Sequence, residues 1–362
     1  MQRSIRLSLS LSGTVALALA SIPFGISPAA AQDPEAPSAE AADLGVMEIN
    51  LKDAVKFNWG FQGALQGAGT PNQTGIGGFL PLSVGDNSVF FIDALANVNF
   101  ADYDGYSSII NTTVAGTTIS TSSRLGYRWL NNDRSWMFGL NAGYDTRPMA
   151  TAYADTGISV DSSSTVFFQQ VAAGLEAVSD SWNFNAYGLF PVGTTEFKLN
   201  SRYLGGALST YGLDVGYAIT PEWDASIGYY YQHGDNLTAD DGSGVLAALA
   251  YEITDGLTLG VKVSYDEAFE TRVSGNIEYR FGNGNATEVE KKTWQTPVIQ
   301  ALTESVKHRD VRVHDGNKIK NQPCNTGSVT KKTNGTAYHC SFWNTAKGKF
   351  WSTASQCETQ KC

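Results

Sequence analysis

Residues 133–147 read DRSWMFGLNAGYDTR, and large apolar side chains alternate there with small or polar ones. The apolar positions fall on every second residue, at Trp136, Phe138, Leu140, Ala142 and Tyr144. A period of two predicts a β-strand whose two faces differ. Whether the apolar face lies against a protein core or against lipid then decides the fold.

The same alternation recurs along the chain from Val55 to Phe281, each time followed by a turn. We predict twelve strands, over residues 55–66, 76–84, 88–100, 119–131, 134–146, 164–178, 181–193, 207–219, 222–233, 243–254, 257–267 and 271–281. The second is the weakest, because Pro81 interrupts it. Connections after odd-numbered strands are mostly long, whereas those after even-numbered strands are GDN, NND, SD, TP and DG. This pattern is typical of an antiparallel meander with short periplasmic turns and both ends on the periplasmic side.

The second face of these strands carries too many charges for a dry core, where charged side chains are rarely buried. The inward-facing charged residues that we predict are Asp93, Arg124, Arg128, Asp145, Glu176, Asp214, Asp224, Glu252, Lys262, Arg272, Glu278 and Arg280. They suit a wet lumen, so the apolar face must meet lipid, and closure removes the strand edges that a bilayer does not tolerate. Five tryptophans near strand ends would form an interfacial girdle: Trp59, Trp129, Trp136, Trp182 and Trp223.

The predicted fold class is therefore all-β, a twelve-stranded antiparallel up-and-down transmembrane β-barrel with a short C-terminal tail. Charged residues make up 17 % of the chain, below the roughly 25 % of an average soluble domain. No stretch approaches the ~20 apolar residues of a membrane helix, which excludes a helical membrane protein. The alternative is a secreted soluble β-sandwich or solenoid.

The chain divides into four predicted regions. Residues 1–31 have a charged start, an apolar middle and a small-residue end, as in a secretory signal, with a retained anchor as the alternative. Residues 32–53 are expected to form an acidic flexible linker, although LGVMEINLKDA near its end suits either a short helix or an extended arm. The barrel covers residues 54–281. Residues 282–362 form a lumen linker and a short basic, Cys-containing segment.

Charge separates the barrel from the tail. From Gln32 to Phe281 there are 11 Lys and Arg against 29 Asp and Glu, a balance of −18. From Gly282 to Cys362 there are 12 against 6, a balance of +6. A basic strand inside an acidic lumen is electrostatically favourable.

Several motifs resemble the translocator barrels of inverse autotransporters, the intimin and invasin family. They are FLPLSVGDNSVFF (79–91), RLGYRWL (124–130), WMFGLNAGYD (136–145), AAGLEAVSDSWNFNAYGLF (172–190) and DVRVHDG (310–316). The resemblance implies twelve strands and a barrel that holds or exports the chain that follows it. KHRDVRVHDG (307–316) stands where the lumen linker would be, with Arg309, Arg312 and His314 as its basic residues. Phe281 at the end of NIEYRF fits the aromatic ending that the barrel-assembly machinery reads.

The sequence also departs from this family. Members usually carry a long chain of immunoglobulin-like or lectin-like modules, whereas 81 residues follow Phe281 here without a repeated unit. Residues 32–53 contain no peptidoglycan-binding module. Adhesion is therefore not supported by the resemblance.

The tail contains all four cysteines, Cys324, Cys340, Cys357 and Cys362. In an exported chain an even number of cysteines favours disulfides, and three pairings are open. A metal site with His314 and His339 is the alternative, but no compact zinc spacing is present, and a disordered tail is a third. Aromatic residues alternate there with lysines, a combination that binds glycans or nucleic acid; a small stapled domain with an aromatic core is the favoured interpretation.

One histidine in the barrel raises the question of catalysis. His233 lies at the outer end of a strand near Asp235, Asp240 and Asp241, and His and Asp groups at a barrel rim can activate water. A solvated loop is the favoured interpretation, because one clustered loop does not supply carboxylates from opposite sides of a cleft. We expect that the protein has no enzymatic activity and binds no cofactor and no metal.

The predicted function is a translocator that holds or displays its own C-terminal segment at the cell surface. The alternative is a small passive porin for polar solutes, with the tail as plug or periplasmic arm. Expected partners are outer-membrane lipid, the barrel-assembly machinery and the chain's own tail in the lumen. A cell-surface or glycan ligand for the tail is open, and no nucleic acid is expected.

Overall fold

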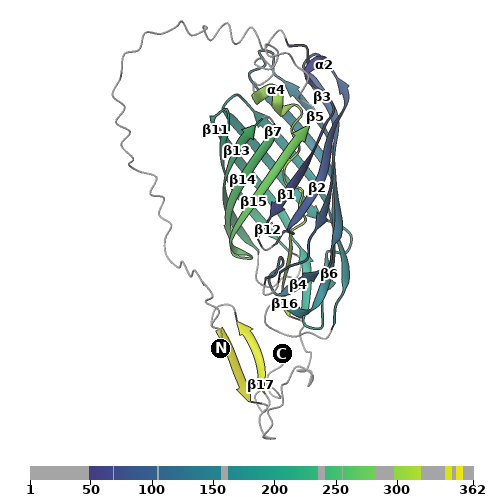
Figure 1. Cartoon of the computed structure of the whole chain (residues 1–362), viewed down its shortest axis with the longest axis vertical. Helices are drawn as coiled ribbons and strands as arrows, with labels where there is room; N and C mark the ends of the chain where they lie inside the picture. Colours follow the sequence, from purple (N-terminus) through teal and green to yellow (C-terminus); the bar gives the residue numbers. More distant parts are fainter. Residues whose placement is uncertain are drawn as a thin grey trace, which may run out of the picture. The chain divides into compact units, whose positions relative to one another are not determined.

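The computed structural model describes residues 49–67, 69–103, 106–155, 162–234, 241–254, 256–281, 297–318, 339–344 and 348–353. Twelve antiparallel strands form a closed barrel (Figure 1). They are β1 (Asn58–Leu65), β2 (Gln73–Val84), β3 (Ser88–Asn99), β5 (Thr118–Leu130), β6 (Met137–Asp155), β7 (Thr165–Val178), β8 (Trp182–Pro191), β11 (Ser209–Thr220), β12 (Trp223–His233), β13 (Gly242–Thr254), β14 (Leu257–Asp266) and β15 (Glu270–Phe281). Pairing of β1 with β15, from Trp59↔Phe281 to Leu65↔Gly275, closes the ring. The predicted fold class is confirmed.

The outer face of the barrel is apolar and the inner face is polar. In β14, Leu259, Val261 and Val263 are 42–54 % exposed, whereas Ser264 and Asp266 are 7 % and 0 % exposed. Exposed apolar side chains also alternate with buried polar ones in β5, where Ser120, Ser122, Arg124 and Arg128 are buried. Such an arrangement is the reverse of a soluble protein and is what a lipid environment requires.

Aromatic rings gather at the edge of the barrel that carries the short turns. Trp59 stacks on Phe281 with ring centroids 4.7 Å apart, and Trp223 lies 4.5 Å from Tyr251. Trp136 and Trp182 both stack on Phe184. Two short helices, α2 (Leu51–Ala54) and α4 (Pro297–Ala301), lie at the same edge (Figure 1).

The opposite edge carries the long loops and additional strands. β4 (Thr112–Ala115) pairs with the outer part of β6. β9 (Glu196–Lys198), β10 (Tyr203–Ala207) and β16 (Val313–Lys318) form a three-stranded sheet. A separate hairpin pairs β17 (His339–Asn344) with β18 (Gly348–Thr353).

Some predicted boundaries were wrong. The first strand begins at Asn58 rather than at residue 55, because α2 and its capping residues occupy the preceding positions. The last residues of the expected flexible linker are packed, with Ile49 8 % and Leu51 1 % exposed. β6 continues to Asp155, beyond the predicted end at 146, because its outer part finds partners in β4 and β7. Pro81 is accommodated by a register shift between Pro81 and Ser83.

Several predictions concern residues outside the described ranges. They include the secretory signal (1–31), most of the linker (32–53) and the cysteines at 324, 357 and 362. Cys340 lies in β17, where the backbone alone is described. The disulfides therefore stay a prediction. Within the described ranges, none of the helices has the length and apolar character needed to cross a membrane.

Candidate functional site: a segment held inside the barrel

Residues 297–318, which we call the plug, run along the inside of the barrel. The plug consists of α4, the connecting residues 302–312 and β16. Near the short-turn edge, Asn58 Nδ2 of β1 donates a hydrogen bond to Thr303 O (3.1 Å). Near the long-loop edge, the Val313 N–H donates to Gly69 O (3.1 Å). The plug therefore extends from one edge of the barrel to the other.

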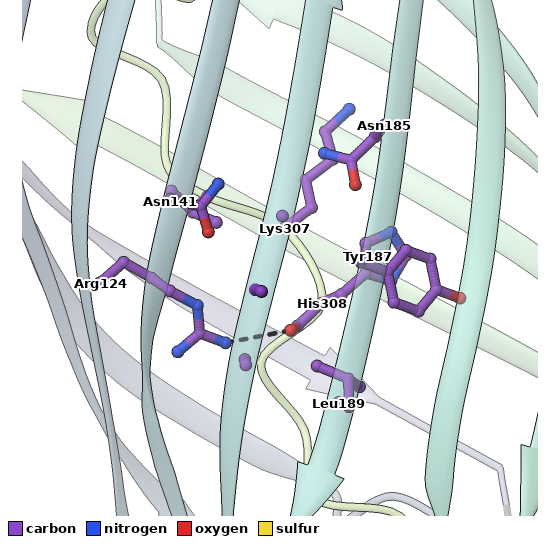
Figure 2. Close-up of a pocket in the computed structure, with 11 residues that line it drawn as sticks. Arg124, Asn141, Asn185, Tyr187, Leu189, Lys307 and His308 are labelled. Atoms are coloured by element: carbon purple, nitrogen blue, oxygen red, sulfur yellow. Dashed lines mark hydrogen bonds between the residues drawn. The ribbon is translucent and has the colours of Figure 1, made fainter.

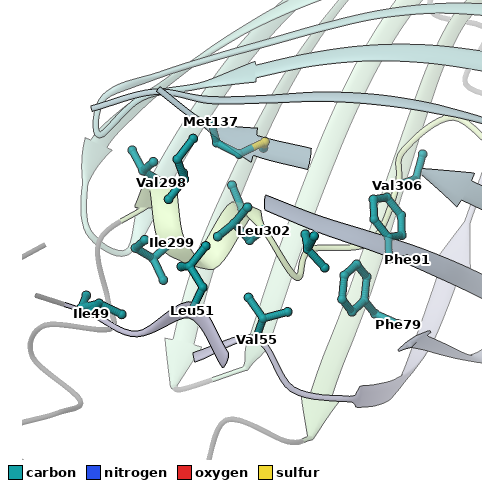
Figure 3. Close-up of a cluster of buried hydrophobic side chains, with 13 residues drawn as sticks. Ile49, Leu51, Val55, Phe79, Phe91, Met137, Val298, Ile299, Leu302 and Val306 are labelled. Carbon is teal, nitrogen blue, oxygen red and sulfur yellow. The ribbon is translucent and has the colours of Figure 1, made fainter. Parts of the chain in front are cut away.

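A cluster of apolar side chains closes the short-turn end (Figure 3). Ile49, Leu51 and Val55, from α2 and its flanks, pack there with Val298 and Ile299 of α4. Further members of the cluster come from the inner wall and the plug: Phe79, Val89, Phe91, Leu130, Met137, Ala301, Leu302 and Val306. The N-terminal arm of the barrel and the first turn of the plug thus share one core.

The arm is also fixed by polar contacts. The Asn50 side chain accepts a hydrogen bond from the Lys52 N–H (3.1 Å) and caps α2. Arg134, in the turn before β6, donates hydrogen bonds to Ile49 O (2.6 Å) and to Asp86 O (2.9 Å) in the turn between β2 and β3.

Two arginines of β5 combine an ion pair within the wall with contacts to the plug backbone. Arg124 makes a bidentate pair with Asp145 (2.6 and 2.8 Å) and also donates to His308 O (3.2 Å). Arg128 pairs with Glu176 (2.8 and 3.1 Å) and donates to Leu302 O and Glu304 O (3.3 and 2.7 Å). Bidentate pairing satisfies each carboxylate and leaves donors free for the plug carbonyls.

Two carboxylates of the wall contact plug side chains instead. Asp93 Oδ2 on β3 lies 2.7 Å from Arg309 Nη2 and accepts a hydrogen bond from the Val306 N–H (3.0 Å). Asp214 Oδ2 on β11 lies 2.7 Å from His308 Nε2. The His308 ring stacks on Tyr187 with centroids 3.7 Å apart.

The outer end of the lumen contains a second charged group. Asp266 accepts hydrogen bonds from Tyr230 Oη and Arg272 Nη2, both at 2.6 Å. Arg312 of the plug lies 4.4 Å from the centroid of the Tyr230 ring and donates to Gln232 Oε1 (3.2 Å). His314 Nε2 lies 3.0 Å from Ala268 O.

Loop residues complete the outer end. Asp315 of β16 accepts hydrogen bonds from the backbone N–H groups of Asn111 (2.9 Å) and Thr112 (2.6 Å). In the same loop Asp102 accepts from the N–H groups of Val114 (2.7 Å) and Ser108 (3.0 Å). Burial raises the pKa of Asp102 above its ordinary value, although these donors act in the opposite direction.

The remaining predicted lumen residues are spread over the inner face. Arg280 pairs with Glu278 (2.6 Å) and donates to Thr303 O (3.1 Å). Glu252 accepts from the Gly256 N–H in its own turn (3.0 Å). Asp224 is exposed near the short-turn edge, and Lys262 is half-buried on β14. In place of a wet lumen, the structure has a packed one, because the plug lies inside it and the inner charges pair with one another or with the plug.

Sequence reasoning missed several residues of this interior. Arg147 donates to Val311 O (2.9 Å) and to Gly69 O (2.6 Å). It continues the alternation of β6 but lies beyond the strand end that we predicted. Asp310 of the plug accepts hydrogen bonds from Gln66 Nε2 (3.0 Å) and Gln73 Nε2 (2.9 Å). Because glutamine is uncharged, the pattern of inward-facing charges does not predict these two partners.

The two cavities described between plug and wall are small. The cavity shown in Figure 2, lined by Arg124, Asn141, Tyr187, Lys307 and His308 among others, has a volume of about 10 Å³. A single water molecule needs about that much room. His233, at the rim, lies 2.6 Å from Asp241 with both side chains exposed, while residues 235 and 240 are outside the described part. The expectation of no enzymatic activity stays a prediction.

No protein-family model and no curated protein matches the sequence. Among solved structures, one titled "Unveiling the Mechanism Behind the in-meso Crystallization of Membrane Proteins" is 11 % identical and aligns over 72 % of this chain and 99 % of its own, with a TM-score of 0.51. The KdgM porin is 9 % identical over 62 % of this chain and 99 % of its own, with a TM-score of 0.34. An outer membrane channel from Pseudomonas putida F1 is 13 % identical and aligns over 62 % of this chain and 94 % of its own, with a TM-score of 0.34.

This chain is an outer-membrane β-barrel. The likeness concerns the fold, and the exposed apolar face agrees with it. The closed barrel with its apolar outer face is located in the outer membrane.

Proposed function

We propose that this barrel is a translocator that holds its own C-terminal segment and displays it at the cell surface, as the resemblance to inverse autotransporters implies. The observation that supports this most is the course of the plug. It begins at the short-turn edge, where β15 also ends, and it reaches the long-loop edge at β16. Short turns of such barrels face the periplasm, so the chain after Lys318 would leave on the outer side.

The contacts suggest how the barrel holds the chain. Arginines of the wall donate to backbone carbonyls of the plug, which any polypeptide offers. At the outer end β16 adds a strand to β10, from Ala207↔Val313 to Tyr203↔Lys318. Backbone pairing of this kind gives affinity without requiring a particular sequence.

A passive porin is the alternative. It would require the plug to leave the lumen, since the cavities described beside it hold about one water each. It predicts a periplasmic tail and steady ion conductance of the intact protein. The packed lumen favours the translocator over this pore.

The partners follow from the same proposal. Lipid surrounds the apolar face, the barrel-assembly machinery reads the strand that ends at Phe281, and the tail occupies the lumen with its first part. The ligand of the displayed segment would belong to a cell surface or be a glycan, in line with the aromatic and basic composition of the tail.

Proteolysis of intact cells tests the proposal. An epitope placed after Cys362 should be removed by proteinase K added to whole cells, while the barrel stays in the membrane. Loss of the epitope after opening of the outer membrane, but not before, would place the tail in the periplasm and favour the pore. Conductance of the purified protein in planar bilayers would then be measured.

A further inference from the structure

The charged groups of the inner wall that contact the plug fall into two classes, according to whether they contact its backbone or its side chains. The first class includes Arg124 and Arg128, each neutralised by a carboxylate of the wall. Their remaining donors reach backbone carbonyls of His308, Leu302 and Glu304. Since a carbonyl recurs at every residue, these arginines can grip a chain of any sequence and in many registers.

The second class comprises Asp93 and Asp214. In the part of the chain that the structure describes, Asp93 makes its hydrogen bond and its ion pair with the plug, at the Val306 N–H and the Arg309 guanidinium. Asp214 likewise has His308 as its described partner. Asp93 is 1 % and Asp214 9 % exposed, so a lost partner would not be replaced freely by water.

We infer that Asp93 and Asp214 determine the register at which the exported chain comes to rest, by recognising the side chains of Arg309 and His308. This inference rests on the proposed translocator function and adds the device that stops the chain. The arginines then bind the backbone of the passing chain in any register, and the two aspartates fix the final register, which we call the stop.

The geometry suits a stop because adjacent plug residues contact nearly opposite walls. His308 reaches β11 and Arg309 reaches β3, which lie five strands apart in one direction around the barrel and seven in the other. Both contacts form together in the observed register. His308 also has a positive φ of 55°, a conformation that is uncommon outside glycine, and its ring stacks on Tyr187.

Three of the neighbouring registers satisfy these aspartates less well. A shift of two residues puts Asp310 or Val306 in the place of His308 beside Asp214. Asp310 has the same charge as Asp214, and Val306 has no polar side chain. A shift of one residue towards the periplasm puts Asp310 beside Asp93, again a like charge. A buried carboxylate without a donor or beside another carboxylate is unfavourable, so these registers are disfavoured.

Trypsin provides the test, because Lys307, Arg309 and Arg312 are cleavage sites inside the barrel. Full-length protein purified in detergent should resist cleavage at these sites. Asp93→Asn and Asp214→Asn should each raise the cleavage rate by about tenfold or more, since a buried side chain of the plug then loses its carboxylate partner. Glu252→Gln is the matched control, because it removes an inner carboxylate whose described contact lies in its own turn, and it should leave the rate unchanged.

Charge exchange decides whether recognition is responsible. Arg309→Asp should loosen the plug, seen as faster cleavage at the two remaining sites, Lys307 and Arg312, and Arg309→Asp combined with Asp93→Arg should restore resistance at these sites. Arg309→Gln and His308→Gln repeat the test without altering the strands, in case a wall variant yields no heat-modifiable barrel. Wild-type cleavage rates in these two plug variants, or in both folded aspartate variants, would overturn the inference. The proteinase K test on cells is independent of the trypsin test. If the tail is displayed but the aspartate variants resist trypsin as the wild type does, the role of Asp93 and Asp214 in setting the register is refuted, whereas the translocator function is not.

Discussion

At the scale of residues, the interior is organised by ion pairs that are almost dry. Arg128 and Glu176 are 2 % and 7 % exposed and form a bidentate pair, and the Arg128 guanidinium also lies 4.7 Å from the centroid of Phe91. Removing one partner of such a pair leaves an uncompensated buried charge, which is more unfavourable than losing the attraction alone. The half-exposed pair of Glu278 and Arg280 should matter far less.

We therefore expect Glu176→Gln to destabilise the barrel by about 3 kcal/mol. The temperature at which the compact gel form converts to the unfolded form should fall. Glu278→Gln, the matched control, should cost less than about 1 kcal/mol. Equal conversion temperatures for the two variants would contradict the assignment of Arg128–Glu176 as a buried pair.

At the scale of elements, close approach of strands depends on glycines that face inwards. A Cβ on Gly143 of β6 would lie 1.8 Å from Ser123 O on β5, whereas a Cβ on Gly275 of β15 would meet its nearest atom at 3.8 Å. Gly143→Ala should therefore reduce the yield of heat-modifiable barrel after refolding, and Gly275→Ala should not. A normal yield for Gly143→Ala would show that β5 and β6 can separate without loss.

The arm before β1 gives a second prediction for an element. Leu51 of α2 is 1 % exposed in the core shared with α4, while Lys52 on the same helix is exposed. Leu51→Asp places a charge in that core and should release α4, and with it the plug, from the lumen. Single-channel recordings should then show ion conductance that neither the wild type nor Lys52→Asp shows. Closed recordings from Leu51→Asp would mean that the arm does not seal the barrel.

These elements differ in how far the sequence predicts them. Lipid outside and polar groups inside impose a period of two on every strand, so alternation alone placed all twelve. The stretch around Trp136 to Tyr144 illustrates this, since its apolar residues do face outwards in β6. The short helices α2 and α4 have too few residues for a helical period. Partners such as Asp93 and Arg309 depend on the register of plug against wall, which no local pattern encodes.

At the scale of the whole molecule, the account requires an apolar exterior. Val261 is 54 % exposed and lies in the middle of β14, so Val261→Arg should cost about 2–4 kcal/mol at the bilayer midplane and reduce insertion into vesicles. Lys262→Arg, one residue away on the inner face, should insert normally. Efficient insertion of Val261→Arg would contradict the lipid-facing assignment of this surface.

The central claim is that the chain passes through the barrel from the periplasmic to the outer side. Its most direct test places the same short tag either between Phe281 and Pro297 or after Cys362, and treats intact cells with a membrane-impermeant label. We expect that the tag after Cys362 is labelled on intact cells, and that the tag before the plug is labelled only once the outer membrane has been opened. Labelling of both tags from the same side would contradict the passage of the plug through the lumen.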